Sequence, residues 1–346
     1  MSQLDSYSML IVCQYIQDDV DFMNIITISK KFQETTDKFF YNPTDSLSLF
    51  KNLQTQFLYK KKTKAVPEIE NHIYVYPVTI KEAQRLLKDP KTICRTVLYT
   101  KDDQKKTKTP IPDFVTVIDD DAFLNSKVKA LVVPQELQVI GRNAFSGCLF
   151  QRFDIPKKVK EMKESAFSQC INLTRVEIPL CLHMLSKSCF SGCLSLSEIV
   201  LESTLITLED KVFCGCSSLK KIGIPQSVTY IGCAVFSNCF NLSQVDLPDK
   251  VAFLGANCFD DCTSLKTIKL PSLLTSLKKS TFFDCSSLDN LEIPENIRSV
   301  GYNCFCNCIH IRHLKLPNKV VEYGKSAFGG CYQLRDIVTL PEYAYL

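Results

Sequence analysis

Residues 265–288 read LKTIKLPSLLTSLKKSTFFDCSSL, and this stretch decides the fold. Leu265, Ile268 and Leu270 form an apolar pattern that ends in alternation, which predicts a short strand with one buried face. Pro271 has no backbone N–H, so we expect it to end that strand before a second apolar turn follows. A unit of this size cannot bury its apolar face alone, so it needs to stack on copies of itself.

The same unit recurs along most of the chain. Ten phenylalanines follow one another at intervals of 22 or 23 residues. They are Phe123, Phe145, Phe167, Phe190, Phe213, Phe236, Phe259, Phe282, Phe305 and Phe328. A proline comes 11 or 12 residues after most of them. We therefore expect about ten stacked coils, with the strands in a parallel sheet and the phenylalanines in one continuous spine.

Half of the 18 cysteines fall in one column of this repeat. They stand three residues after a repeat phenylalanine, at Cys148, Cys170, Cys193, Cys216, Cys239, Cys262, Cys285, Cys308 and Cys331. A single column of nine cannot pair completely, and a regular stack need not offer disulfide geometry. We expect a ladder of buried, reduced thiols that act as small hydrophobic groups with weak donors. Cys214 and Cys306, just after the phenylalanine, should lie nearer the surface.

The sequence also bears on location. Residues 1–21 have no basic segment before their short apolar run and do not resemble a secretory signal. Together with reduced thiols, this favours a reducing, cytoplasmic location. No run approaches 18 consecutive apolar residues, so no transmembrane segment is expected. Display on the cell surface by a route without a signal peptide is the alternative.

Composition and charge narrow the classes of partner. Of the 346 residues, 45% are hydrophobic and 23% are charged, so the chain can bury a large core. The net charge of +4 lies in residues 1–112, which hold 17 basic and 13 acidic side chains. Residues 113–346 hold 24 of each. A neutral solenoid does not predict binding to nucleic acid.

The first 112 residues lack the repeat and are expected to be largely helical. Apolar residues recur at helical spacing on both sides of the stretch 18–21, which predicts two helices, the second capped by Asp21. Thr79 and Glu82 have the spacing of a capping box and should open a further helix. The predicted division of the chain is a helical segment (1–60), a capping region with a solvated linker at 101–112 (61–112), and the solenoid (113–346).

Residues 219–242, LKKIGIPQSVTYIGCAVFSNCFNL, carry the repeat pattern in full. The pattern resembles the BspA-type leucine-rich repeat, and the resemblance covers residues 113–341. It implies an α+β fold in which a curved leucine-rich repeat solenoid follows an N-terminal helical cap domain. The parallel sheet of I-x-I-P strands would line the concave face. The resemblance also implies a role in protein–protein interaction and, in some microbes, in surface adhesion.

Residues 4–32 are similar to an F-box, with a leading leucine, an apolar helix and an I-x-x-S-K-K-F ending. An F-box followed by leucine-rich repeats implies a substrate receptor of a cullin-type ubiquitin ligase that docks a Skp-type adaptor. By this resemblance the docking face would consist of Leu4, Met9, Leu10, Ile16, Phe22 and Ile25. A solenoid also needs a terminal cap over its first coil, and the helices could serve as that cap alone.

The outward side chains of the predicted I-x-I strands form two columns on one face. The candidate protein-binding residues on this face are Lys129, Arg152, Asp154, Arg175, Glu177, Glu198, Lys221, Asp246, Lys269, Glu292, His313 and Lys315. We expect Arg152, Arg175 and Lys221, with Asp154 and Glu177, to form a patch that recognises a peptide or protein. The alternative is a solvated sheet face with cross-strand charge pairs.

Motifs of catalysis or metal binding are not recognised in the sequence. The densest set of metal-ligand residue types, Cys304, Cys306, Cys308, His310 and His313, is accounted for by the repeat, so neither a metal nor another cofactor is expected. The sequence therefore predicts a non-enzymatic interaction protein. A cell-surface adhesin or antigen is the alternative. The end of the chain, residues 340–346, lacks a polar cap and predicts self-association through the last coil.

Overall fold

The computed structural model describes residues 6–16, 18–28, 34–106, 110–201, 204–317, 320–334 and 344. The chain divides into two compact units, Met1–Tyr99 and Thr100–Leu346. This division lies upstream of the solenoid start predicted at residue 113.

The first unit begins with two short helices, α1 (Ser6–Cys13) and α2 (Asp19–Ile28), as predicted. The cap of α2 differs from the prediction. Asp18 Oδ1 accepts hydrogen bonds from the backbone N–H groups of Val20 (2.7 Å) and Asp21 (3.2 Å), so Asp18 rather than Asp21 is the capping residue. Two 3-10 turns follow, η1 (Glu34–Lys38) and η2 (Leu47–Leu49).

Aromatic side chains form the core beside these helices. The Phe22 ring lies edge-on to Phe50 and Phe39, with centroid separations of 5.3 and 5.9 Å. Met9 and Cys13 of α1 are buried in the same cluster. These contacts fix both helices against the following turns.

The rest of the first unit contains strands that the helical prediction missed. A three-stranded parallel sheet has the order β1 (Thr55–Leu58), β2 (Asn71–Tyr74), β4 (Thr92–Cys94), and β3 (Val78–Thr79) pairs with β5 (Val97–Tyr99). Helix α4 (Ile80–Leu86) begins where predicted, because Thr79 accepts a hydrogen bond from the Glu82 N–H at 3.3 Å. The strands are only two to four residues long, which leaves little periodicity to detect.

The second unit opens with helix α5 (Lys101–Lys106), which stands where the sequence predicted a linker. Thr100 and Asp103 cap each other: the Thr100 N–H donates to Asp103 Oδ2 (2.9 Å), and the Asp103 N–H donates to Thr100 Oγ1 (3.3 Å). Acidic residues in the first turn and lysines in the last also suit the helix dipole.

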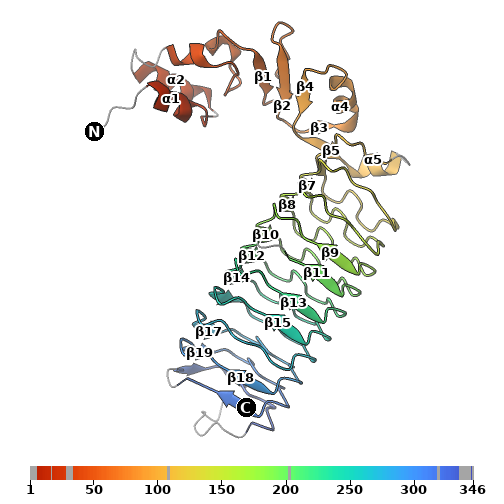
Figure 1. Cartoon of the computed structure of the whole chain (residues 1–346), viewed down its shortest axis with the longest axis vertical. Coiled ribbons are helices and arrows are strands. Elements are labelled where there is room, and N and C mark those ends of the chain that lie inside the picture. Colours follow the sequence, from red (N-terminus) through yellow and green to blue (C-terminus); the bar gives the residue numbers. More distant parts are fainter. Residues whose placement is uncertain are drawn as a thin grey trace. The chain divides into compact units, whose positions relative to one another are not determined.

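The solenoid of the second unit has two parallel strand series (Figure 1). Six of the predicted I-x-I strands form: β9 (Arg175–Glu177), β11 (Glu198–Val200), β13 (Lys221–Gly223), β15 (Gln244–Asp246), β18 (Asn290–Glu292) and β20 (His313–Lys315). The strand predicted from Leu265, Ile268 and Leu270 is reduced to a single bridge at Thr267, Arg152 also forms only a bridge, and residues 128–132 form no strand. The second apolar turn of each coil, for which no sheet was predicted, forms the other series. Its strands are β6 (Val117–Ile118), β7 (Val139–Ile140), β8 (Glu161–Met162), β10 (Met184–Leu185), β12 (Thr207–Leu208), β14 (Tyr230–Ile231), β16 (Phe253–Leu254), β17 (Ser276–Leu277), β19 (Ser299–Val300) and β21 (Glu322–Tyr323).

The predicted phenylalanine spine is confirmed. All ten rings are buried, and each stacks on the next with centroid separations between 5.2 and 6.0 Å. The backbone of the same turn also joins neighbouring coils, since the Phe236 N–H donates to the Cys258 carbonyl of the next coil at 2.9 Å. One coil is therefore registered on the next at every repeat.

The cysteine column lies beside this spine and has a specific bonding pattern. Each of the nine thiols donates to the carbonyl of the phenylalanine one coil earlier, at 3.0 to 3.3 Å. Burial raises the pKa of Cys148 and Cys331 to about 12, so these thiols stay protonated near neutral pH. All 18 cysteines are free. The expectation of buried thiols with a weak donor role is confirmed.

The spine gives a direct stability prediction. Phe236→Ala removes a fully buried ring that stacks on Phe213 and Phe259, and should lower the free energy of unfolding by about 3–5 kcal/mol. Urea unfolding followed by far-UV circular dichroism measures this change. Phe240→Ala is the matched control, because that ring is 44% exposed and its loss should change the free energy by less than about 1 kcal/mol. Equal effects of the two substitutions would contradict the assigned spine.

Candidate interaction surface

The I-x-I strands present their flanking residues outward, on what we call the I-x-I face. In β9 the central Val176 is buried, whereas Arg175 and Glu177 on either side are exposed, and β13, β15, β18 and β20 repeat this arrangement. All twelve residues predicted as protein-binding are exposed. Alternation along a strand places those that lie on β9, β11, β13, β15, β18 and β20, whereas Lys129, Asp154 and Lys269 are exposed outside any strand.

Grooves hollow this face at two places among the described residues. The first, which we call the arginine groove, has a volume of about 570 Å³. Its charged lining residues are Arg152, Asp154, Lys157, Arg175 and Glu177. Four of the five residues of the predicted patch thus come together here, and Lys221 does not belong to this groove.

The two arginines of the arginine groove are direct neighbours. Arg152 and Arg175 are bridge partners on adjacent coils, and Arg175 is in turn the register partner of Glu198 on β11. Arg175 and Glu198 form an ion pair, which neutralises one of the arginines. Within the described part of the chain, Arg152 and Lys157 form no ion pair. The groove therefore holds two basic side chains without an ion pair, beside the carboxylates of Asp154 and Glu177 that line the same groove.

Turn residues also line this groove, and none of them was predicted as a binding residue. Lys157, Leu180 and Cys181 come from the turns that follow the strands, and Leu180 is 56% exposed. Strand alternation does not predict where turn residues project. Lys157 and Leu180 both stand two residues after the last residue of the I-x-I motif. This repeated position is the signal in the sequence that could have identified them.

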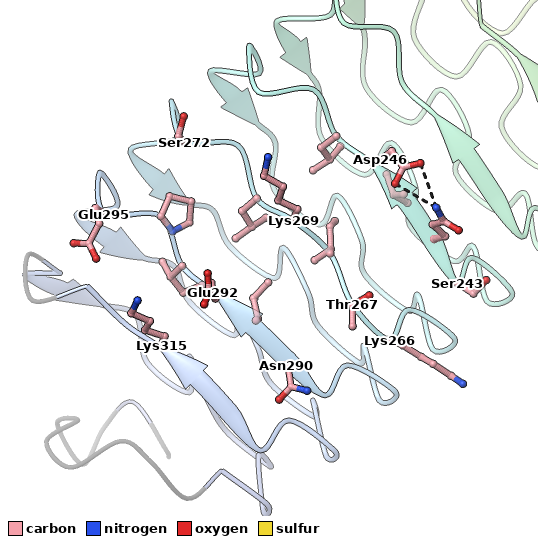
Figure 2. Close-up of a pocket in the computed structure, with 18 of the residues that line it drawn as sticks. Ser243, Asp246, Lys266, Thr267, Lys269, Ser272, Asn290, Glu292, Glu295 and Lys315 are labelled. Carbon is pink, nitrogen blue, oxygen red and sulfur yellow. Dashed lines mark hydrogen bonds between the residues drawn. The ribbon is translucent and has the colours of Figure 1, made fainter.

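The second groove, which we call the mixed-charge groove, has a volume of about 1190 Å³ and spans the coils from β13 to β20 (Figure 2). Its charged lining residues are Lys221, Asp246, Lys266, Lys269, Glu292, Glu295 and Lys315. Gln244 Nε2 donates to the two Asp246 carboxylate oxygens at 3.4 and 3.3 Å. Lys269 forms an ion pair with Asp249 at 3.0 Å.

Strand pairing is interrupted beneath this groove. Among the described coils from Val117 to Tyr323, only one junction lacks pairing in both strand series. It separates β15 from the segment 267–269, and β16 from β17. The phenylalanine turns of the same two coils remain joined, for Phe259 N–H donates to the Thr281 carbonyl at 2.9 Å and the rings of Phe259 and Phe282 are 5.4 Å apart. We call this junction the seam.

The second strand series carries an aromatic pair that the sequence reasoning overlooked. Tyr230 and Phe253 stack face to face with a centroid separation of 4.7 Å, and Tyr230 is partly exposed. Lys278 Nζ lies 5.9 Å from the Phe253 centroid, which is within range of a cation–π contact. Both aromatic residues directly precede the buried residue of a two-residue strand.

The cysteines and histidines near residue 308 lie where their positions in the repeat predict. Cys304 and Cys308 are buried in the core, and His313 lies exposed on β20. His310 Nδ1 lies 2.6 Å from the Ser286 carbonyl. No group of three potential ligand residues suited to a metal ion occurs within the described residues.

Unlike the exposed residues of the I-x-I face, the described residues predicted to dock an adaptor are buried or partly buried. Met9 and Phe22 are buried in the core of the first unit, and Ile16 and Ile25 are partly buried against it. Leu4 and the side chain of Leu10 lie outside the described part of the chain. The predicted face therefore coincides largely with the packing face of the two helices.

Comparison with known families identifies the repeat. A family model described as the BspA type leucine-rich repeat region matches residues 98–220 and 206–335, which together exceed half of the chain. The chain belongs to this family. A search of curated proteins finds no match. Within the described residues, no helix has the length and apolar character needed to cross a membrane.

Solved structures of leucine-rich repeat proteins resemble the chain. A protein from Eubacterium ventriosum is 18% identical with a TM-score of 0.53, over 85% of this chain and 87% of that one. A protein from Bacteroides ovatus is 22% identical with a TM-score of 0.50, over 84% and 80%. The T. pallidum leucine-rich repeat protein is 31% identical with a TM-score of 0.44, over 54% and 78%. The first two likenesses show the solenoid fold.

The cysteines provide a test of this surface. Cys181 is exposed in the arginine groove, whereas Cys214 and Cys306 are only partly exposed and burial raises the pKa of both. Iodoacetamide at pH 8 should therefore alkylate Cys181 fastest, and the ladder thiols only after unfolding. Peptide mapping by mass spectrometry measures the order. Cys181→Ser should remove the fast phase, and a fast phase that persists in this variant would contradict the assignment.

Proposed function

We propose that this protein recognises another protein through the I-x-I face, with the arginine groove as the principal contact. The family match and the leucine-rich repeat fold support a role as an interaction scaffold. The observation that carries the proposal is the convergence of Arg152, Arg175 and Lys157 in one groove beside the exposed apolar Leu180. Charged groups around an apolar contact are typical of protein-binding surfaces.

The charge of the groove indicates the chemistry of the partner. Arg152 and Arg175 are adjacent on neighbouring coils, and like charges placed opposite one another are unfavourable in a sheet. Arg175 is already paired with Glu198, so an acidic side chain of a partner would pair chiefly with Arg152, and an arginine can bind a carboxylate by two parallel hydrogen bonds. The preferred partner segment is therefore acidic, with an apolar residue that contacts Leu180.

Charge reversal tests this function. The double variant Arg152→Glu, Arg175→Glu should weaken partner binding by at least about 100-fold, because two attractive contacts become repulsive. Affinity capture followed by quantitative mass spectrometry identifies the proteins that the wild type retains and the variant loses. The double variant Lys160→Glu, Lys250→Glu is the matched control, since it changes the charge equally at exposed positions outside both grooves. An unchanged set of captured proteins would refute the proposal.

The cellular location of the partner is part of the same proposal. A cytoplasmic receptor and a surface-displayed protein would use the same groove, because recognition depends on the I-x-I face alone. The reduced thiol ladder supports a reducing compartment. Labelling intact cells with a reagent that cannot cross membranes separates the two locations.

A second candidate function is docking of a Skp-type adaptor by α1 and α2. The observation in its favour is apolar exposure on the helices and the turn between them, where Tyr15 is 80% exposed and Ile11, Val12 and Met23 are also exposed. These residues differ from the predicted docking face, of which Met9 and Phe22 belong to the core. An adaptor would bind the exposed set without unfolding the unit.

This candidate predicts a local effect of one substitution. Tyr15→Asp should abolish co-purification of a Skp-type adaptor, because it places a charge in an apolar contact. The protein should remain folded, since Tyr15 is exposed. Lys51→Asp serves as the control, because it introduces the same acidic residue at another exposed position of the first unit. Absence of any adaptor from the wild-type preparation would exclude this function.

A further inference from the structure

One outward column of the mixed-charge groove alternates in sign. Asp246, Lys269, Glu292 and Lys315 follow one another, one from each successive coil, and all four are exposed. Figure 2 shows them in a row across the groove. Neighbouring paired strands in a parallel sheet lie about 4.8 Å apart, which sets the interval from Lys269 to Glu292 and from Glu292 to Lys315, whereas Asp246 lies across the unpaired seam.

The register of the strands supports this alignment. Glu292 and Lys315 are direct partners in the pairing of β18 with β20. The bridge between Thr267 and Asn290 places Lys269 beside Glu292, because each lies two residues further along its coil. Asp246 occupies the same position on β15. The four charges therefore share one face and one row.

If a second copy of the column is laid against the first in the reverse order, every charge faces one of opposite sign. The column reads negative, positive, negative, positive along the chain, and read backwards it has the opposite sign at each place. We propose that this face binds a second copy of the same chain, antiparallel, across a two-fold axis that runs along the strand direction between Lys269 and Glu292. Asp246 then faces Lys315 of the second copy, and Lys269 faces Glu292 of the second copy.

The adjoining column is compatible with this arrangement. It contains Gln244, Thr267, Asn290 and His313, all of them exposed. The same rotation places Gln244 opposite His313 of the second copy and Thr267 opposite Asn290. These side chains can donate or accept hydrogen bonds, and none of the contacts joins like charges. A two-fold interface repeats each contact twice, so the charged column alone supplies four attractive pairs.

The charges of the column are available for such an interface. Asp246 is hydrogen-bonded within the chain to the neutral Gln244, and Lys269 pairs with Asp249 outside the column. The side chains of Lys269 and Asp249 are 79% and 67% exposed, so that pair is weak and easily exchanged. Within the described residues, Glu292 and Lys315 form no ion pair.

The start of the I-x-I face lacks this symmetry. There the equivalent column contains Asp154 and Glu177, followed by Val200 and Gly223, and its reverse is not complementary. The proposed dimer is thus confined to the mixed-charge groove. It extends the proposed function without resting on it, because partner recognition was assigned to the arginine groove.

Charge exchange in the full-length protein tests the proposal. Sedimentation at low ionic strength should show a dimer for the wild type that weakens as salt is added. Lys269→Glu alone, or Glu292→Lys alone, should each weaken the dimer by at least about 100-fold, because each places like charges together twice. The double variant Lys269→Glu, Glu292→Lys should restore the dimer, since its column is again complementary to its reverse. An equimolar mixture of the two single variants should also form a dimer.

The control is Lys160→Glu, an exposed charge reversal outside the I-x-I face that should leave the dimer unchanged. A wild type that stays monomeric at high concentration would overturn the proposal. So would single variants that associate like the wild type, or a double variant that stays monomeric. Partner capture by the Arg152→Glu, Arg175→Glu variant is measured separately, so failure of the dimer and failure of the proposed function give different results.

Discussion

Each coil of the solenoid is held at the turn that carries its phenylalanine. There the ring stacks on the rings of both neighbouring coils, the backbone N–H donates to the next coil, and the following cysteine thiol donates back to the preceding phenylalanine carbonyl. Buried carbonyl groups need donors, and the thiol supplies one from a side chain small enough for the core. The strands on the other sides of the coil pair less regularly, so the phenylalanine turn sets the register that the exposed face inherits.

The elements that could be predicted from sequence are those that repeat at a fixed interval. The phenylalanine represented by Phe236 recurs at ten positions and the cysteine represented by Cys239 at nine, so their burial and their columns were evident. A two-residue strand such as β14 has no alternation to detect, which is why the second strand series was missed. In the helices, periodicity identified an apolar face, but it does not say what covers that face. The resemblance to an F-box implied that Phe22 belongs to a docking face, whereas the structure packs its ring against Phe39 and Phe50.

The candidate site shows the same limit. Alternation correctly placed Arg152 and Arg175 outward, yet the arginine groove also includes Lys157 from a turn. Lys221, two coils beyond Arg175, lines the mixed-charge groove instead. The two grooves differ in their charge order rather than in their fold. The first holds Arg152 and Lys157 without an ion pair within the described residues, and in the second the charges of one column alternate. One repeating scaffold can therefore present two distinct surfaces, because outward residues are free to vary while the spine is not.

The seam lies where the glycine column of the second strand series is interrupted. A side chain at Gly255 or Gly301 would come within 2.6 Å of the backbone of the preceding coil, whereas the coil between them carries Lys278 at that place. Side chains are accommodated with pairing intact at Lys163 and Glu209, so the lysine alone does not open the junction. Since a solenoid is stabilised coil by coil, its junctions act as links in series. Under tension or partial unfolding the junction with the fewest backbone hydrogen bonds, the seam, would separate first. The solenoid would then behave as two cooperative blocks joined by a compliant hinge.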